Sequence, residues 1–156
     1  MNAALKTKKA DEEIETDGLS SSLGFLLRMA QVKVYEQFTD KPNSPQLKPG
    51  EFTVLWLIHL NPSVRQGVVA RKLNIKPGHM TKLVRRLEER QIVTRVIPDD
   101  DRRSVELTLT KAGNDLVAAT KDLFIGNGNL TENALSEQEI LQLTKLLKKF
   151  VGFKQE

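Results

Sequence analysis

Basic side chains are concentrated in one quarter of the chain, where they could bind phosphate groups. Residues 65–103 contain 11 Lys and Arg against 5 Asp and Glu, a net charge of +6, whereas the remaining residues together carry −2. The whole chain of 156 residues carries only +4. A local excess of this kind is typical of a surface that contacts a phosphate backbone. The alternative is a solvated face that happens to be rich in arginine, and charge alone does not decide between the two.

The residue types needed for covalent catalysis or metal binding are scarce. The chain has no Cys, which excludes a disulfide framework, a thiolate metal site and a Cys nucleophile. The two His, His59 and His79, cannot alone build a zinc site, although carboxylates could join them. No nucleophile–base pair, Gly-rich phosphate loop or paired carboxylates can be recognised. We therefore expect no enzyme activity, no cofactor and no bound metal.

The length and a hydrophobic share of 39% suit one folded domain, or one domain elaborated for oligomerisation. The longest apolar run, residues 54–58, is too short to span a membrane. The first residues are followed by charge and not by the apolar segment of a secretion signal. We expect a cytoplasmic protein with a flexible tail over residues 1–18.

Residues 66–85 have the spacing of a helix-turn-helix. Asn74 falls at the turn, where a left-handed backbone is needed, and Pro77 opens the second helix. An ordinary helical hairpin is the alternative. The outward positions favour a face that enters a groove, because they are polar or small. The apolar positions that would pack the two helices are Val69, Ala70, Leu73, Ile75, Met80 and Leu83.

After residue 91 the apolar period changes from 3.6 to 2, which predicts short strands at 94–97 and 105–109 joined by a turn-rich loop. A helix-turn-helix followed by a β-hairpin is a winged helix, which we place at residues 47–110. The expected fold class is mainly α with a small β-hairpin wing.

Helices are expected on both sides of the winged helix. Apolar stripes predict helices at 19–40, 110–125 and 136–153, and a buried central helix at 49–60 that starts at Pro49. Ser20–Ser22 and Thr110 can cap helices, and Ser136 begins an S-x-x-E capping box. The prolines at 42 and 45 predict a loop, and Gly126–Asn129 should break a helix.

The terminal helices carry more apolar surface than a domain of this size needs for itself. We therefore expect a homodimer built from residues 19–46 and 111–156. Two-fold symmetry would present two recognition helices to a near-palindromic DNA site, with half-sites about 34–36 Å apart.

The chain resembles the MarR family of transcriptional regulators. The resemblance is carried by residues 47–55, by residues 76–88, and by Asp101 to Thr110, which match the family's D-x-R-x-x-x-x-x-L-T wing signature, with Gly113 just beyond it. It covers residues 19–153. Lys48 stands where a Thr cap is common, and the 126–129 break interrupts what is usually a long helix.

The expected DNA contacts lie on the recognition helix and the wing. Lys and Arg suit phosphate or guanine contacts, and a slim helix start lets the backbone approach the major groove. The resemblance assigns Arg103 to the minor groove and an orienting ion pair to Asp101, whereas a hairpin-stabilising pair is the alternative. Arg65, Arg71 and Lys72 are expected to touch phosphates or merely to solvate a face. The candidates are Lys76, Pro77, Gly78, His79, Thr81, Lys82, Arg85 and Arg86 on the helix, and Asp101, Arg102 and Arg103 on the wing.

The resemblance also implies a small-molecule effector, often an aromatic carboxylate, bound between the dimer helices and the winged helix. The candidates are Phe25, Arg28, Met29, Trp56 and His59. Arg28 could pair an anionic ligand, whereas ordinary core packing is the alternative for the apolar residues.

The first helix and the recognition helix are similar to those of repressors of aromatic-acid catabolism, some of which sense aryl-CoA thioesters. Without Cys, a thiol-oxidation sensor is excluded. The prediction is thus a homodimeric repressor released by a small aromatic carboxylate or its CoA thioester. A ligand-independent architectural DNA-binding protein is the alternative, and a steep salt dependence without sequence preference would favour it.

Overall fold

The computed structural model describes residues 16–39, 47–48, 50–99, 101–125 and 135–153. They belong to two compact units, residues 1–34 and 35–156, and the boundary falls within helix α1 (Leu23–Thr39). Three expectations lie outside the described residues: most of the 1–18 tail, the loop with prolines at 42 and 45, and the break at 126–129.

In the first unit, a 3-10 turn, η1 (Leu19–Ser21), precedes α1. The predicted helix therefore begins four residues later than expected, and the Ser22 hydroxyl accepts the Phe25 N–H at 3.4 Å as an N-cap would. Gly18 supplies the positive φ of 79° that turns the chain into η1.

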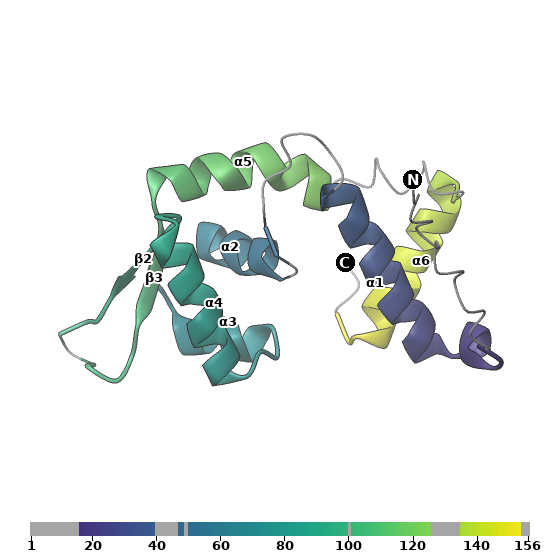
Figure 1. Ribbon diagram of the computed structural model, residues 1–156, viewed down its shortest axis with the longest axis horizontal. Helices are drawn as coiled ribbons and strands as arrows, with labels where there is room; N and C mark the ends of the chain where they lie inside the picture. Colours follow the sequence, from purple (N-terminus) through teal and green to yellow (C-terminus); the bar gives the residue numbers. More distant parts are fainter. Residues whose placement is uncertain (1–15, 40–46, 49, 100, 126–134, 154–156) are drawn as a thin grey trace, which may run out of the picture. The chain divides into compact units, whose positions relative to one another are not determined.

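The second unit contains a winged helix, drawn in blue to green in Figure 1. Helix α2 (Glu51–Leu60) is followed by β1 (Val64–Arg65), α3 (Gln66–Lys72), α4 (Pro77–Glu89), β2 (Val93–Val96), β3 (Glu106–Leu109) and α5 (Lys111–Ile125). The strands form one antiparallel sheet in the order β1-β3-β2. The expected fold class is confirmed: the described chain is mainly helical with a small β-sheet wing.

The helix-turn-helix is formed as predicted by α3 and α4. Asn74 has a φ of 52°, the left-handed conformation that the turn requires, and Pro77 is the first residue of α4. The Ile75 N–H closes the turn on the Ala70 carbonyl at 2.8 Å.

The sheet contains one strand that was not predicted, β1, and helix α2 begins at a different residue from the predicted one. Strand β1 has only two residues, which pair with Leu107 and Glu106 of β3, and a strand this short leaves no periodicity to detect. Helix α2 begins at Glu51, because Gly50 is its N-cap with a φ of 83°.

Helix α2 is the central helix of the core, as its apolar sequence predicts. Its side chains Val54, Leu55 and Ile58 are at most 1% exposed. It packs against α3, α5 and β3, while α4 adds Met80, Leu83, Val84 and Leu87 to the same core. Burial of each such side chain contributes about 1.5–3 kcal/mol, so the sheet and helices are fixed around α2.

The junction between the wing and α5 is tightly packed. The Thr110 hydroxyl donates to the Gln91 carbonyl at 2.7 Å and accepts the Gly113 N–H at 3.0 Å, so Thr110 caps α5 as predicted. Gly113 lies directly against the Ile92 carbonyl, where a Cβ would overlap the oxygen. The Gly that follows the wing signature is thus required by close approach of two backbones.

Helix α6 (Glu137–Phe150) begins with the predicted capping box. The Ser136 hydroxyl accepts the Glu139 N–H, and the Glu139 carboxylate accepts the Ser136 N–H at 2.8 Å. The Ser136 N–H and the Ser136 hydroxyl both donate to this carboxylate and hold the pKa of Glu139 below its usual value. No helix in the described part of the chain is both long and apolar enough to cross a membrane.

Gly113→Ala should destabilise the protein by about 1–3 kcal/mol, because the added methyl group forces α5 away from the 91–92 turn. The measurement is the midpoint of urea unfolding. Gly78→Ala is the matched control, since the Cβ it adds near the start of α4 has no atom within 4 Å apart from its chain neighbours and the nearby backbone of its own helix. Equal midpoints for the two variants would contradict the packing described.

Candidate nucleic-acid interface

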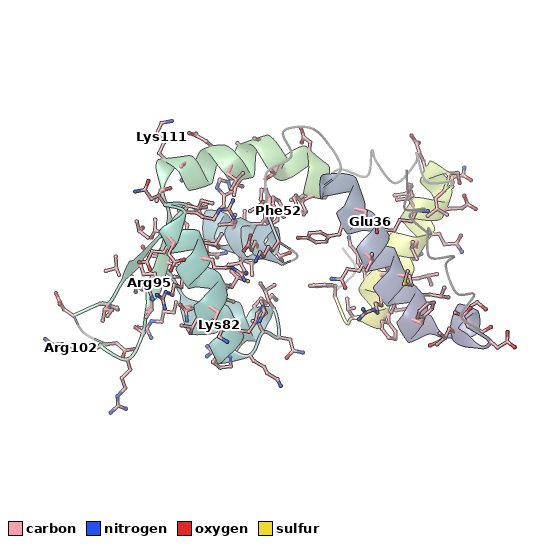
Figure 2. All side chains as sticks on the ribbon, in the orientation of Figure 1. Glu36, Phe52, Lys82, Arg95, Arg102 and Lys111 are labelled. Carbon is pink, nitrogen blue, oxygen red and sulfur yellow. The ribbon has the colours of Figure 1, made fainter. Side chains whose placement is uncertain are left out.

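Helix α4 exposes one polar face, as a recognition helix must. Seven of the eight expected contact residues are exposed, and Figure 2 shows Lys82 among them. Four apolar side chains on the opposite side of α4 are buried. The helix therefore presents a hydrophilic surface that can enter a groove. The seven exposed residues are Lys76, Pro77, Gly78, His79, Thr81, Lys82 and Arg85.

Two of these residues already have partners. The Thr81 hydroxyl donates to the Pro77 carbonyl at 3.0 Å and lies 3.3 Å from the Gln66 amide nitrogen on α3. Arg85 pairs with Glu89 at 3.0 Å on the exposed surface. Exposed i,i+4 pairs contribute only about 0.3–0.5 kcal/mol, so Arg85 can exchange Glu89 for a phosphate at little cost.

Arg86 is placed differently from its neighbour Arg85. Its guanidinium lies 3.0 Å from a carboxylate oxygen of Glu51, and Arg90 reaches the other oxygen at 3.4 Å. Glu51 is 1% exposed, while the two arginine side chains remain 39% and 38% exposed. The structure thus turns the expected DNA contact Arg86 toward the protein, where it positions α4.

Glu51 is also held at the start of α2. Its carboxylate accepts the Lys48 N–H at 2.8 Å, and the Lys48 carbonyl accepts the Tyr35 hydroxyl at 2.7 Å. Burial raises the pKa of the Tyr35 phenol above its ordinary value. A continuous series of polar contacts therefore joins Tyr35 on α1 to Arg86 of α4 and to Arg90, the C-cap residue of that helix.

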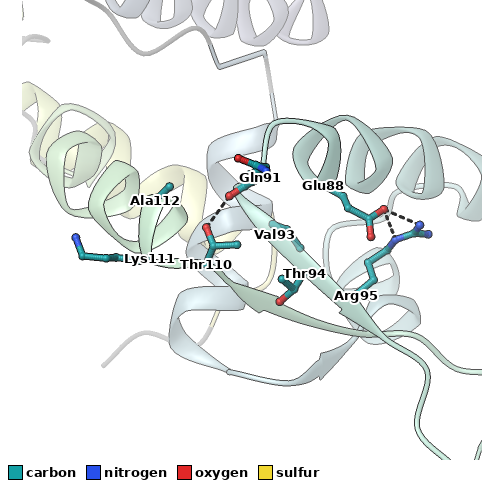
Figure 3. Close-up of a pocket in the computed structure, with 8 residues that line it drawn as sticks. All are labelled: Glu88, Gln91, Val93, Thr94, Arg95, Thr110, Lys111 and Ala112. Atoms are coloured by element: carbon teal, nitrogen blue, oxygen red, sulfur yellow. Dashed lines mark hydrogen bonds and ion pairs between the residues drawn. The ribbon is translucent and has the colours of Figure 1, made fainter.

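The wing is tied to the recognition helix at its base. Arg95 on β2 contacts one oxygen of Glu88 on α4 through two nitrogens, at 2.6 and 2.7 Å. Figure 3 shows this pair and, on the other side of Val93 and Thr94, the Thr110–Gln91 hydrogen bond. These residues line a cavity of about 520 Å³. Because α4 carries Glu88 as well as Arg86, and Arg90 is its C-cap residue, one helix fixes both the core contact and the wing.

In the wing loop, the Asp101 carboxylate does not form the expected ion pair with the Arg103 guanidinium. The Asp101 carboxylate pairs with Arg65 at 3.6 Å and accepts the backbone N–H of Arg103 at 3.2 Å. Asp101 therefore shapes the loop beneath Arg103 but leaves its guanidinium without that partner. Arg102 and Arg103 are exposed, and Figure 2 shows Arg102 projecting from the end of the wing.

Two of the expected effector residues lie together on α2. The rings of Trp56 and His59 are 5.5 Å apart, and His59 Nδ1 lies 3.1 Å from the Asn114 side-chain oxygen on α5. Trp56 is partly buried and also stacks at 5.9 Å on Phe52.

The other three expected effector residues lie on α1 in the first unit. Phe25 is half-buried, whereas Arg28 and Met29 are exposed. A crevice that brings these residues to Trp56 and His59 stays a prediction.

Sequence reasoning missed the aromatic cluster around Phe52. Phe52 stacks on Phe124 of α5 at 3.9 Å, and Tyr35 meets the edge of Phe124 at 6.4 Å. The three aromatic residues lie far apart in the chain, so no local sequence pattern indicates that they form a cluster. Glu51 had a detectable signal, because it shares the i, i+4, i+7 stripe of α2 with the buried Leu55 and Ile58.

Comparisons with known proteins agree with this geometry. The MarR family model matches residues 47–105. A protein of Thauera aromatica named for transcriptional regulation of the hcr operon is 27% identical over 138 residues, covering 88% of this chain and 83% of that protein.

Solved structures of the transcriptional repressor CouR are also similar. CouR bound to a 23-mer DNA duplex is 32% identical with a TM-score of 0.77, covering 89% of this chain and 99% of that chain. CouR bound to p-coumaroyl-CoA is 29% identical with a TM-score of 0.76, covering 89% and 98%.

Glu51→Gln should destabilise the protein by about 3 kcal/mol, because Arg86 and Arg90 lose a buried counter-charge. This is the lower end for a broken buried pair, since both arginines are over a third exposed. The measurement is the free energy of urea unfolding. Glu89→Gln is the matched control and should cost about 0.5 kcal/mol or less. A loss at position 51 as small as that at position 89 would refute the positioning role.

Proposed function

The chain belongs to the MarR family of winged-helix transcriptional regulators, and from this premise we propose that it is an effector-responsive repressor. It binds a near-palindromic operator as a homodimer. A small aromatic carboxylate or its CoA thioester binds the protein and releases the DNA. The observation that carries the proposal is an exposed polar recognition face on the same fold as CouR, a repressor solved with DNA and with p-coumaroyl-CoA.

On DNA, α4 enters the major groove with its slim first turn. Pro77 and Gly78 let the helix start approach the base edges, while His79, Lys82 and Arg85 supply contacts to bases or phosphates. Arg103 enters the minor groove, where a planar guanidinium suits the negative potential. The hydrogen bond of 3.2 Å from the Arg103 N–H to the Asp101 carboxylate supports this assignment, because it fixes the backbone while the side chain stays exposed.

The proposed homodimer accounts for the exposed apolar residues of the terminal helices. On α6, Leu143, Leu146 and Phe150 share one stripe and are 45–67% exposed. On α1, Leu23 and Leu26 are 57% and 47% exposed. Large apolar side chains in such rows mark interaction surfaces. Their burial in a two-fold dimer would place two α4 helices at half-sites about 34–36 Å apart.

The proposed effector acts near the aromatic cluster on α2 and α5. Trp56 and His59 offer a ring face and a polar edge beside Phe52 and Phe124, which suits an aromatic acid. Arg28 on α1 is the expected partner of a carboxylate or phosphate. The path from the cluster to DNA is short, because Phe52 follows Glu51, whose carboxylate holds Arg86 of the recognition helix.

The test begins with duplexes selected from a random-sequence pool by the full-length protein. We expect a near-palindromic consensus, and p-coumaroyl-CoA or p-coumarate should weaken binding to it by about 5- to 150-fold, the usual range of allosteric coupling. Affinity is measured by fluorescence anisotropy at fixed salt, because the phosphate contacts make it salt-dependent.

Two negative results would contradict different parts of the proposal. Selection without a consensus, together with a steep salt dependence and no response to a panel of aromatic acids and CoA thioesters, would favour the architectural DNA-binding protein. A clear consensus without any response to the panel would refute only the effector class.

A further inference from the structure

A second cavity lies between the start of α3 and the wing loop. It has a volume of about 390 Å³, and its lining includes Arg65, Gln66, Gly67, Arg71, Arg103 and Ser104. The two walls are joined by the Gln66 N–H, which donates to the Val105 carbonyl at 2.8 Å. The cavity is thus built from the helix-turn-helix on one side and the wing on the other.

The charge around this cavity is unbalanced. Three arginines line it, and the carboxylate that pairs with one of them belongs to Asp101, 3.6 Å from Arg65. Both members of that pair are exposed, at 51% and 36%, so the pair is weak. Within the part of the chain that the structure describes, Arg71 and Arg103 have no carboxylate within 4.0 Å. An anion that replaced the carboxylate would face three arginines.

The shape of the cavity also suits a small anion. Gly67 contributes no side chain, and the Arg71 guanidinium lies over it, 3.7 Å from the place a Cβ would occupy. Gln66 connects the cavity wall to the recognition helix through Thr81 at 3.3 Å. Guanidinium groups bind phosphate through paired N–H donors, which makes phosphate the anion best matched to this lining.

We propose that this cavity is a phosphate site, in which Arg65 and Arg71 bind one backbone phosphate of duplex DNA. The Asp101 carboxylate holds Arg65 in the free protein and is exchanged for the phosphate on binding. The inference rests on the proposed function and adds an anchor that ties the wing to the helix-turn-helix on DNA. A free phosphorylated molecule has the same chemistry and is distinguished by the test.

The experiment measures binding of a random-sequence duplex against salt concentration, so no operator is required. Arg71→Ala should weaken binding at least threefold and reduce the salt slope by about 0.9 for each protomer bound, because one phosphate contact is lost. Lys121→Ala is the matched control, since it removes one exposed positive charge from α5, outside the cavity. It should leave the slope unchanged.

A second variant tests the exchange of Asp101. Asp101→Asn keeps an oxygen for the Arg103 N–H but removes the competing charge, so it should tighten binding of the random duplex at least twofold. Asp99→Asn removes an exposed charge from the same loop and is the control. If position 101 only stabilised the loop, Asp101→Asn would bind no more tightly than Asp99→Asn, which would overturn the exchange.

Inorganic pyrophosphate distinguishes the source of the phosphate. Arginine side-chain NMR signals of the wild type that shift with pyrophosphate, while Arg71→Ala leaves DNA affinity and slope unchanged, would assign the site to a free phosphorylated molecule. Equal slopes for Arg71→Ala and Lys121→Ala with no pyrophosphate response would overturn the phosphate site. If the wild type binds no duplex at all, the proposed function fails and the pyrophosphate titration alone decides the site.

Discussion

The buried carboxylate of Glu51 is the constraint on which the recognition helix depends. A charge that is 1% exposed is tolerated only when it is paired, and its partners are Arg86 of α4 and Arg90, the C-cap residue of that helix. Rotation or translation of α4 would leave that carboxylate unpaired. The same helix holds the wing through Glu88 and Arg95. The orientation of the exposed face and the position of the wing therefore follow from how α4 is seated on α2.

Glu51 also lies where an effector signal would have to pass in the proposed function. Its carboxylate accepts the Lys48 N–H, and the Lys48 carbonyl accepts a hydrogen bond from the hydroxyl of Tyr35, whose ring contacts Phe124 in the aromatic cluster. Phe52, the next residue, stacks on Phe124. A ligand that separated these rings would disturb the start of α2 and, with it, the ion pairs that seat α4. No further conformational change is needed to link the proposed effector site to the recognition helix.

Local signals predicted most of the fold, and long-range pairing explains what they missed. The turn at Asn74 and the capping box at Ser136 depend on neighbours in the chain, so their residue types were sufficient. The pairs Glu51–Arg86 and Asp101–Arg65 join segments 35 and 36 positions apart. No local pattern specifies such partners. Arg85 and Arg86 look alike in sequence, yet adjacent helical positions point about 100° apart, so one faces solvent and the other Glu51.

The most direct test of this account is the ratio of affinities for a selected duplex and a random duplex, measured for wild type and Glu51→Gln while both are folded. The surface cations are the same in both proteins, so binding of the random duplex should change less than twofold. The ratio should fall at least tenfold in the variant, because α4 is no longer held in register with the bases. An unchanged ratio would contradict the claim that the Glu51 carboxylate positions the recognition helix.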